Sequence, residues 1–329
     1  MWFEKLTGFK EESPENIRKN LRIEGDSFVS KANNKKFTFG KLEIPTLEQL
    51  QQSNPPLDSY KDTLQISVLV ADVMELHCQI ENENALFQAA SQFNLLEMVG
   101  PDVTPEHGID RYELDHTQGP ACAIACGAGT IYRNYFVELD SQIGQTADKQ
   151  IDCLDLIGKE FQNEKLNLWE MRNGYALASQ EGLLTINEKL AELTNQERES
   201  LKQKLKVGIQ WNTEVTQSDS KHKVSQIYCS ALPVSYTGIA SKYWEPFARL
   251  ILEATYEATL HTALLNAKNN SSNVVYLTLV GGGAFGNDKM WVLESLKKAI
   301  QKFKNTPLDV RIVRYSSSNM DLVAYLSEK

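Results

Sequence analysis

A glycine-rich loop over residues 281–287, "GGGAFGN", holds residue types that could bind an anion. It follows an apolar run and precedes a segment with helical spacing. Glycine has no Cβ to block close approach and tolerates positive φ, so successive backbone N–H groups can converge on an anion. The N-terminus of a following helix adds about half a positive charge. The loop therefore predicts a diphosphate site with Phe285 against a sugar, and a tight turn without a ligand is the alternative.

This loop matches neither of two common phosphate-binding motifs. The dinucleotide fingerprint GxGxxG follows the first strand of its fold, and the P-loop ends in Gly-Lys-Ser/Thr. Here the glycines lie near the end of the chain and are followed by Asn-Asp-Lys. We therefore expect neither motif's mode of binding.

An acidic loop over residues 99–117, "VGPDVTPEHGIDRYELDHT", is the second stretch suited to chemistry. Loops of this length inside a compact domain are uncommon and often functional. Asp115 precedes a glycine-proline turn, with His116 and Gln118 beside it, and a carboxylate there can activate water. We take Asp115 as the first catalytic candidate, and Gln118 as a second residue that could hydrogen-bond water or a sugar hydroxyl. Four other carboxylates are alternatives that fit a solvated loop equally: Asp102, Glu106, Asp110 and Glu113.

Alternation along "GIQWNTEV" gives a third candidate, Glu214. Gln210, Asn212 and Glu214 share one face of a strand. If that face borders a cleft, Glu214 or Asn212 could bind a cationic side chain. If it faces solvent, the segment is an ordinary half-buried strand. Arg133 in turn could hold a phosphate or cap helix carbonyls.

Metal and disulfide chemistry are not indicated. Cys122 and Cys126 lie four residues apart on a small-residue helical stretch, and no second Cys/His pair stands nearby. Packing on one helix face explains them better than metal binding. The five cysteines are an odd, dispersed set, typical of reduced thiols in a cytosol-like compartment. We expect hydrolysis without a metal or other cofactor, although magnesium held through waters would leave little trace in a sequence.

The elements that must position these residues predict an α/β sheet. Strand, loop and helix alternate in the C-terminal half, which is typical of parallel strand pairs. Ligands in such sheets bind where strand carboxyl ends meet helix N-termini. The expected strands cover 63–76, 84–98 in its first part, 206–217, 223–236, 274–280 and 308–315. The expected helices cover 118–136, 149–161, 188–205, 243–270, 289–304 and 319–327. Residues 1–60 are polar and mixed, with a hairpin over 27–44, and predict an extension packed on the core.

Composition excludes several classes of protein. The 329 residues carry a net charge of −9, which provides no electrostatic footprint for nucleic acid. No run reaches the ~20 apolar residues that span a membrane, and the N-terminal residues show no signal peptide. We therefore expect no nucleic-acid or membrane partner.

Two C-terminal segments carry a resemblance to a known family. "VVYLTLVGGGAFGND" and "LDVRIVRYSSSNMDLVAYL" resemble the C-terminal half of the macrodomain, an ADP-ribose-binding fold. The resemblance implies a three-layer α/β/α mixed sheet over 61–329, with residues 1–60 as the extension. It implies that the glycine loop wraps the diphosphate and distal ribose, and that Asp72 and Tyr315 meet the adenine. The implied ligand contacts are Asp72, Val73, Gln92, Phe93, Asn94, Gly281, Gly282, Gly283, Ala284, Phe285, Gly286, Asn287 and Tyr315.

The sequence departs from the usual macrodomain pattern in its first ligand loop. The asparagines of that pattern are replaced by Gln88 and Ser91, and Gln92, Phe93 and Asn94 follow. An aromatic residue after the alanine pair looks more like the poly(ADP-ribose) glycohydrolase branch. The usual GGG of that loop is missing, and the acidic loop takes its place.

Further segments are similar to a narrower group, the MavL-type arginine-specific macrodomain ADP-ribosylhydrolases. They include "SQFNLLEM", "DHTQGPACAIACGAGTIYRNYF", "GIQWNTEV" and "CSALPVSY". This similarity implies an ADP-ribosylated protein as partner, ADP-ribose as product, and the cytosol, or a host cytosol for a secreted effector, as location. The catalytic residues expected are Asp115, Gln118 and Glu214. A macrodomain that binds ADP-ribose or a related nucleotide without turnover, or an α/β protein with a partner surface, remain alternatives.

Overall fold

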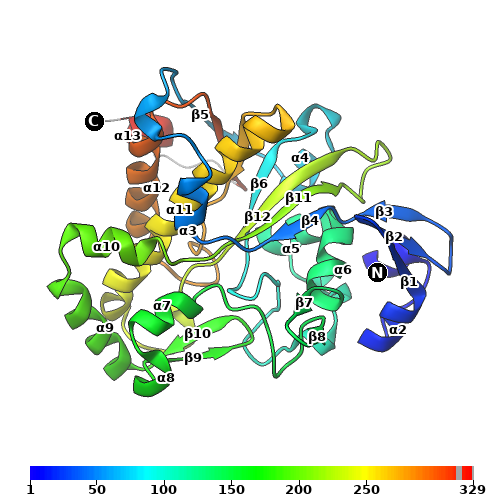
Figure 1. Ribbon diagram of the computed structural model, residues 1–329, viewed down its shortest axis with the longest axis horizontal. Helices are drawn as coiled ribbons and strands as arrows, with labels where there is room; N and C mark the ends of the chain where they lie inside the picture. The colour runs from blue at the N-terminus through cyan, green and yellow to red at the C-terminus, as the bar shows by residue number, and fades with distance from the viewer. Residues whose placement is uncertain (316–320, 328–329) are drawn as a thin grey trace.

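The computed structural model describes residues 1–315 and 321–327. A seven-stranded mixed sheet with order β4-β11-β12-β6-β13-β14-β5 runs through the molecule (Figure 1). The five strands from β12 to β5 are parallel to their neighbours, while β11 pairs antiparallel with β12 and with β4. The strands of this sheet are β4 (Lys41–Glu43), β5 (Gln65–Val70), β6 (Leu86–Ala90), β11 (Gly208–Glu214), β12 (Lys223–Cys229), β13 (Val274–Leu277) and β14 (Asp309–Arg314).

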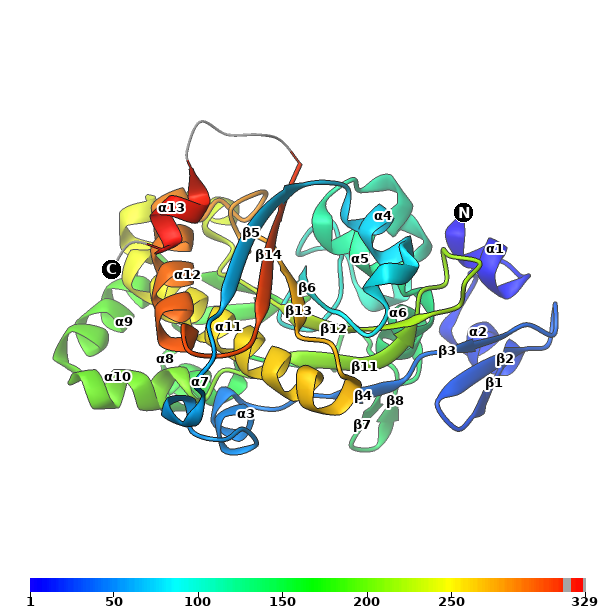
Figure 2. The ribbon, with the colours of Figure 1, turned by 90° about the horizontal axis from the view of Figure 1, so that it is seen from above.

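Helices cover both faces of the sheet, as Figure 2 shows from above. The long helix α11 crosses one face and packs against α12, α9 and α3, and α12 packs against α13. The helices α4, α5 and α6 lie on the other face, where α5 contacts β6 and α6 contacts β11. These helices are α3 (Leu47–Gln52), α4 (Val73–Cys78), α5 (Gln118–Ala125), α6 (Gly127–Tyr135), α9 (Gln180–Glu192), α11 (Ser241–Asn270), α12 (Lys289–Phe303) and α13 (Leu322–Ser327). The predicted three-layer α/β/α arrangement is confirmed.

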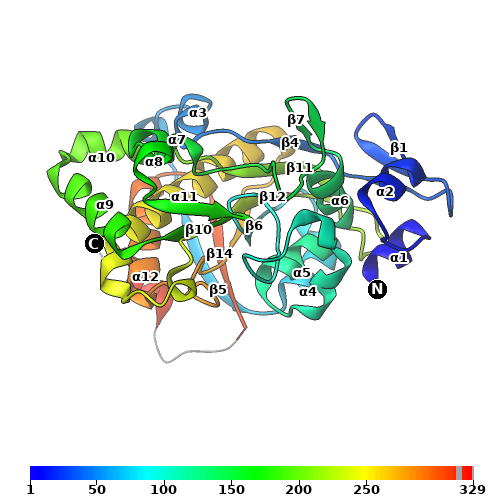
Figure 3. The ribbon, with the colours of Figure 1, turned by 90° about the horizontal axis from the view of Figure 1, so that it is seen from below.

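Smaller elements flank this body. Figure 3 shows the N-terminal helices and three-stranded sheet at one end of the molecule, beside α6, and α9 and α10 at the other end. The N-terminal elements are α1 (Trp2–Thr7), α2 (Pro14–Asn20), β1 (Leu21–Glu24), β2 (Ser27–Ser30) and β3 (Lys36–Thr38). The remaining elements are β7 (Glu138–Leu139), β8 (Gln142–Ile143), α7 (Asp155–Glu160), α8 (Asn163–Leu166), β9 (Trp169–Arg172), β10 (Tyr175–Ala178) and α10 (Asn195–Lys202). Short 3₁₀ helices lie at Leu57–Ser59, Ile80–Asn82, Pro105–His107, Asp110–Leu114 and Val234–Tyr236.

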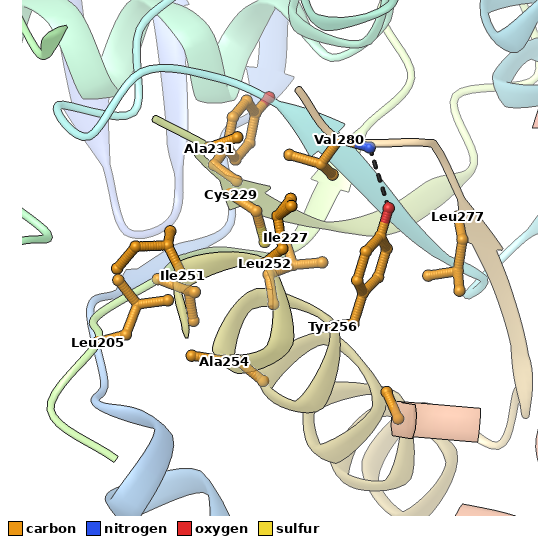
Figure 4. Close-up of a cluster of buried hydrophobic side chains, with 14 of the residues drawn as sticks. Leu205, Ile227, Cys229, Ala231, Ile251, Leu252, Ala254, Tyr256, Leu277 and Val280 are labelled. Carbon is orange, nitrogen blue, oxygen red and sulfur yellow. Dashed lines mark hydrogen bonds between the residues drawn. The ribbon is translucent and has the colours of Figure 1, made fainter. Parts of the chain in front are cut away.

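The core between α11 and the sheet fixes the strand that leads into the glycine loop (Figure 4). Ile251 and Leu252 of α11 are buried near Ile227 of β12 in one continuous apolar cluster. Burying an aliphatic side chain of this size contributes about 1.5–3 kcal/mol. From the same helix, Tyr256 reaches the backbone at Val280, just after β13. The helix thus stabilises both the sheet and the start of the loop.

The structure differs from the predicted elements in several places. The strand expected over 63–76 ends at Val70, and helix α4 begins at Val73. The helix expected over 118–136 breaks at Cys126, whose φ of −113° and ψ of 57° are not helical. The helix expected over 149–161 is shorter, and the one over 188–205 is two helices, α9 and α10. The hairpin β9–β10 was not predicted. The last helix, expected over 319–327, falls partly on residues that the structure does not describe.

Residues 1–60 do not form an extension throughout. The hairpin over 27–44 is present as β2 and β3, with Asn34 at a φ of 58° in the turn. However, β4 is the edge strand of the central sheet and α3 packs on α11, so residues 41–52 belong to the main body. Within the described residues, no helix combines the length and apolar character required to cross a lipid bilayer.

Candidate functional site

A cavity of about 480 Å³ opens where the parallel strands end. Its walls include residues 90–92 after β6, Ala231 after β12, residues 278–281 after β13, and Tyr315 after β14. The first turn of α5 and the preceding residues 115–117 close another side. This is the edge of an α/β sheet at which ligands bind, and the volume falls in the range of small-molecule sites.

The glycine loop contributes backbone donors to this cavity. Gly281 has a φ of +76°, and a Cβ there would lie 2.5 Å from the Cβ of Ala231, so this turn requires glycine. The N–H groups of Gly283, Ala284 and Phe285 have no hydrogen-bond partner among the described residues. The N-terminus of α12 is already capped, because Asp288 Oδ1 accepts from Met290 N at 2.7 Å. Because residues 288–291 also do not border the cavity, an anion there would meet the loop and not the helix end.

The loop is closed at its base by Asn287. Its Nδ2 donates to Leu232 O at 2.8 Å, and its backbone N donates to Gly281 O at 3.0 Å. Asn287, Gly282 and Gly286 were predicted to contact the ligand, but they do not border the cavity, whereas Gly281, Gly283, Ala284 and Phe285 do. Asn287 therefore stabilises the conformation of the loop without bordering the cavity.

Aromatic rings form one wall. The ring centroid of Phe285 lies 5.3 Å from that of Tyr175 and 5.6 Å from that of Tyr236, and all three residues border the cavity. The Tyr175 hydroxyl donates to Met98 O at 2.6 Å, which fixes its ring. An apolar wall with a few polar groups suits a sugar or base. Tyr175 comes from the unpredicted hairpin.

Asp115 borders the cavity, as predicted from its place in the acidic loop. It is half-exposed, and its Oδ1 accepts from Thr117 N at 2.9 Å. Gln118 also borders the cavity, but its amide is committed: Oε1 accepts from Ala90 N at 2.9 Å, and Nε2 donates to Gln88 O at 2.8 Å. Gln118 thus ties the first turn of α5 to the end of β6 and acts as a positioning residue.

Tyr315 links β14 to the acidic loop. Its hydroxyl donates to the carbonyl of His116 at 3.3 Å, and its ring borders the cavity. Partial burial raises the pKa of Tyr315, and the negative charges of Asp72 and Asp115 add to the effect. The two residues expected at the adenine therefore lie near one another, although Asp72 itself does not border the cavity.

Glu97 is a carboxylate that the sequence patterns did not single out. It borders the cavity, its side chain is 5% exposed, and its Oε1 has no hydrogen-bond partner among the described residues. Burial raises the pKa of Glu97 well above the ordinary value of 4.5; nearby Arg133 opposes this change and Asp115 adds to it. A single acidic residue inside the apolar run "NLLEMV" was the available signal.

The structure places Phe93 and Asn94 away from the cavity. Phe93 is 1% exposed in the core, and Asn94 is 0% exposed. Asn94 Nδ2 donates to Gln150 Oε1 at 2.8 Å, and its Oδ1 accepts from Leu96 N at 3.1 Å. Gln92 does border the cavity, but its Oε1 accepts from Met98 N at 2.9 Å. Through these hydrogen bonds and the burial of Phe93, the three side chains stabilise the conformation of residues 92–98.

Glu214 does not join the site. It accepts a hydrogen bond from Thr38 N at 2.9 Å, beside the N-terminal sheet. The predicted alternation fails because a bulge separates Gln210 from Thr213, with Asn212 at a φ of 53°. Gln210 is buried, and its Oε1 accepts from Arg133 Nη1 at 3.3 Å. Glu214 was expected to be catalytic, but it does not border the cavity.

Asp72 and Val73 form the start of α4. Asp72 Oδ1 accepts from Met74 N at 2.7 Å and from Glu75 N at 3.3 Å, which is N-cap geometry. Val73 is buried in the core. Neither residue borders the cavity.

The other acidic candidates have structural partners. Asp102 pairs with Arg172, and Glu106 Oε1 accepts from Ala147 N. Asp110 and Glu113 accept from the backbone N–H groups of Phe3 and Trp2. None of these four carboxylates borders the cavity.

Arg133, Cys122 and Cys126 are interior. Arg133 Nε donates to Leu95 O at 3.1 Å, and its guanidinium lies 3.6 Å from the ring centroid of Tyr228. Arg133 was expected either to hold a phosphate or to cap helix carbonyls. The carbonyl that it binds belongs to Leu95 and not to α6, the helix that carries Arg133. Cys122 and Cys126 are buried free thiols, and over the described part of the chain no cluster of three or more His, Cys, Asp or Glu could hold a metal ion.

Comparisons with known proteins give structural matches alone. No protein-family model matches the chain, and no curated protein matches it. It is similar to poly(ADP-ribose) glycohydrolase from Thermomonospora curvata, with a TM-score of 0.49, 10% identity, and 95% of this chain and 94% of that chain covered. For the same enzyme bound to the inhibitor ADP-HPD, the TM-score is 0.46 and the identity 10%, with 94% of this chain and 93% of that chain covered. For poly(ADP-ribose) glycohydrolase from Deinococcus radiodurans in complex with ADP-ribose, the TM-score is 0.43 and the identity 10%, with 87% of this chain and 90% of that chain covered.

Proposed function

We propose that this protein is a hydrolase that removes mono-ADP-ribose from arginine side chains of proteins. The observation that carries the proposal is that one cavity is bordered both by the glycine loop and by Asp115. The loop supplies donors for a diphosphate, and Asp115 supplies a carboxylate for the reaction. The resemblance of short sequence segments to arginine-specific macrodomain ADP-ribosylhydrolases is the reason for proposing the arginine linkage.

ADP-ribose suits the walls of the cavity. Its diphosphate can accept hydrogen bonds from the N–H groups of Gly283, Ala284 and Phe285. Its sugar and adenine rings can pack against Phe285, Tyr175 and Tyr315.

The chemistry requires a carboxylate at the glycosidic carbon. Cleavage of an N-glycosidic bond passes through an oxocarbenium-like state, and a carboxylate can activate the attacking water while stabilising the positive charge. Asp115 is half-exposed at the cavity wall, where water can reach it. Carboxylates also attract the fixed charge and planar donors of a guanidinium.

Release of free ADP-ribose tests the proposal. The protein is incubated with substrate proteins modified on arginine, glutamate or serine, and the product is quantified by chromatography. We expect release from arginine, and in Asp115→Asn a release rate lower by about 100-fold or more with ADP-ribose affinity within about threefold. Asp102→Asn is the control, because this carboxylate of the same loop pairs with Arg172 outside the cavity.

Two outcomes would contradict the proposal. Binding of ADP-ribose without release from any linkage would favour a module that binds without turnover. Release from glutamate or serine but not from arginine would keep the hydrolase and remove the arginine specificity.

A further inference from the structure

We propose that Glu97 is a second catalytic residue, which protonates the leaving nitrogen, and that the bond to be cleaved lies where two cavities meet. The inference rests on the proposed hydrolase function. It adds a position for the leaving side chain and a proton donor that acts on it.

A smaller cavity of about 230 Å³ adjoins the first. The two cavities share Glu97, Met98, Val99 and Asp115 in their walls. Glu97 and Asp115 are the acidic residues bordering both. If ADP-ribose fills the larger cavity from the glycine loop, its reactive end reaches these carboxyl groups, and the side chain being released extends into the smaller cavity.

The smaller cavity combines apolar walls with the carboxyl groups of Glu97 and Asp115. Val103, Tyr112 and Leu114 contribute apolar surface to it, and the exposed Arg111 also borders it. The methylenes of an arginine can pack on such surface while its guanidinium stays at the carboxyl groups of the shared wall. Leu114 and Val99 are exposed to 69% and 67%. These exposed apolar residues can contact the protein that carries the modified side chain.

The segment that carries Glu97 is held rigidly by neighbouring side chains. Arg133 Nε donates to Leu95 O at 3.1 Å, Glu97 N donates to Tyr112 Oη at 2.8 Å, and the Tyr175 hydroxyl donates to Met98 O at 2.6 Å. Leu95 adopts a φ of 65°, which is rare for a residue with a side chain. Such a conformation persists where the surroundings over-determine it, and these positions cluster at functional sites.

The carboxyl group of Glu97 differs from the rest of this segment in its hydrogen bonding. The backbone around it is bonded, yet its Oε1 is buried without a partner among the described residues. An unpartnered buried oxygen destabilises the fold, so its retention needs a reason other than stability. Glu97 borders the cavity, so a bound substrate that forms a hydrogen bond with its carboxyl group supplies that reason.

The two carboxyl groups have environments suited to different roles. Glu97 is buried, which raises its pKa and favours the protonated acid, while Asp115 is half-exposed to water. A buried carboxyl group beside one that water can reach is typical of an acid and base pair.

Atoms and charges balance in the proposed step. As the C–N bond to the ribose breaks, its electron pair goes to the guanidine nitrogen, which takes the proton of Glu97. Water adds to the ribose carbon, and its proton goes to Asp115. The products are ADP-ribose and an arginine guanidinium, and proton transfer from Asp115 through solvent restores the acid form of Glu97.

Two substrates with different leaving groups separate this role from others. An arginine-modified protein needs a proton on its leaving nitrogen, whereas the 4-nitrophenyl glycoside of ADP-ribose releases nitrophenolate without one. We expect Glu97→Gln to lower the rate on the arginine substrate by about 100-fold or more, and on the nitrophenyl substrate by less than about fivefold. Asp115→Asn should lower both rates strongly, because both substrates need activated water.

Controls keep the test independent of folding and of the wider proposal. Glu43→Gln is the matched variant, since Glu43 accepts from Trp211 Nε1 at 2.8 Å outside both cavities, and it should retain both rates. Glu97→Asp keeps an acid group and should retain more activity on arginine than Glu97→Gln. Melting temperature and ADP-ribose affinity verify that each variant is folded.

Equal losses on both substrates in Glu97→Gln, or full activity on arginine, would overturn the role of Glu97 while leaving the hydrolase intact. A wild-type protein that releases ADP-ribose from neither substrate would overturn the proposed function together with this inference.

Discussion

The hydroxyl of Tyr256 accepts a hydrogen bond from Val280 N at 3.1 Å (Figure 4) and donates one to Thr278 O, also at 3.1 Å. One side chain of the long helix α11 thus fixes both backbone groups at the start of the glycine loop. The donors of that loop depend on its conformation, so the core packing of α11 is connected directly to the cavity.

Tyr256→Phe should therefore loosen the loop. The change leaves Val280 N–H buried without a partner, which costs about 1–3 kcal/mol in the free energy of unfolding. We also expect a several-fold weaker affinity for ADP-ribose. Urea unfolding and calorimetry measure the two effects. Tyr243→Phe on the same helix is the control, and equal behaviour of the two variants would contradict the role of Tyr256.

Two neighbouring glycines should respond differently to alanine. Gly281→Ala places a Cβ 2.5 Å from the Cβ of Ala231 at a φ of +76°, whereas a Cβ on Gly283 meets nothing within 4 Å. The first change should lower the unfolding free energy by more than about 1 kcal/mol and weaken ligand binding. The second should leave stability nearly unchanged. Thermal unfolding of both variants checks this, and a stable Gly281→Ala would show that the turn does not require glycine.

Stability should depend on pH through Glu97. Below pH 4.5 the carboxyl group of Glu97 is protonated in both the folded and the unfolded chain. Because the pKa of Glu97 is raised in the folded state, the folded chain keeps this proton above pH 4.5 while the unfolded chain loses it. The free energy of unfolding therefore falls between pH 4.5 and the folded pKa, by about 1.4 kcal/mol for each pH unit in that interval. The groups that set this pKa besides burial are Arg133 and Asp115, with Tyr112 hydrogen-bonded to the Glu97 backbone.

Glu97→Gln removes that proton linkage. We expect the variant to become more stable than the wild type as the pH increases above 4.5, measured by urea unfolding at pH 5 and pH 8. Other buried acids such as Asp152, with a pKa raised to about 6, are present in both proteins and cancel in the difference. A difference that stays constant with pH would contradict a buried, protonated Glu97.

The sequence predicted the parts of the site that local patterns encode. Gly281 and Phe285 follow a short apolar strand, and Asp115 and Gln118 precede a small-residue helix, so strand–loop–helix order was enough to bring them to one edge of the sheet. The same alternation predicted an α/β sheet with parallel strand pairs, whereas the three-layer arrangement was implied by the resemblance to macrodomains.

Long-range contacts account for what the sequence did not predict. Glu97 was missed because its burial depends on Tyr112 and Arg133, which are distant in sequence. Glu214 was misplaced because the bulge at Asn212 breaks strict alternation. The hairpin that supplies Tyr175 did have a local signal: Asn173 and Gly174, both at positive φ, form the Asn-Gly turn typical of hairpins.

Calorimetric titration of the wild-type protein with ADP-ribose tests the central claim most directly, with Gly281→Ala and Gly100→Ala titrated in parallel. A Cβ on Gly100 meets nothing within 4 Å, and Gly100 borders neither cavity. The account predicts binding at one site that Gly281→Ala weakens at least tenfold, or about 1.4 kcal/mol, and that Gly100→Ala retains. Absence of heat and of any rise in melting temperature at millimolar ADP-ribose would contradict it, because a ligand that binds the native state must stabilise it.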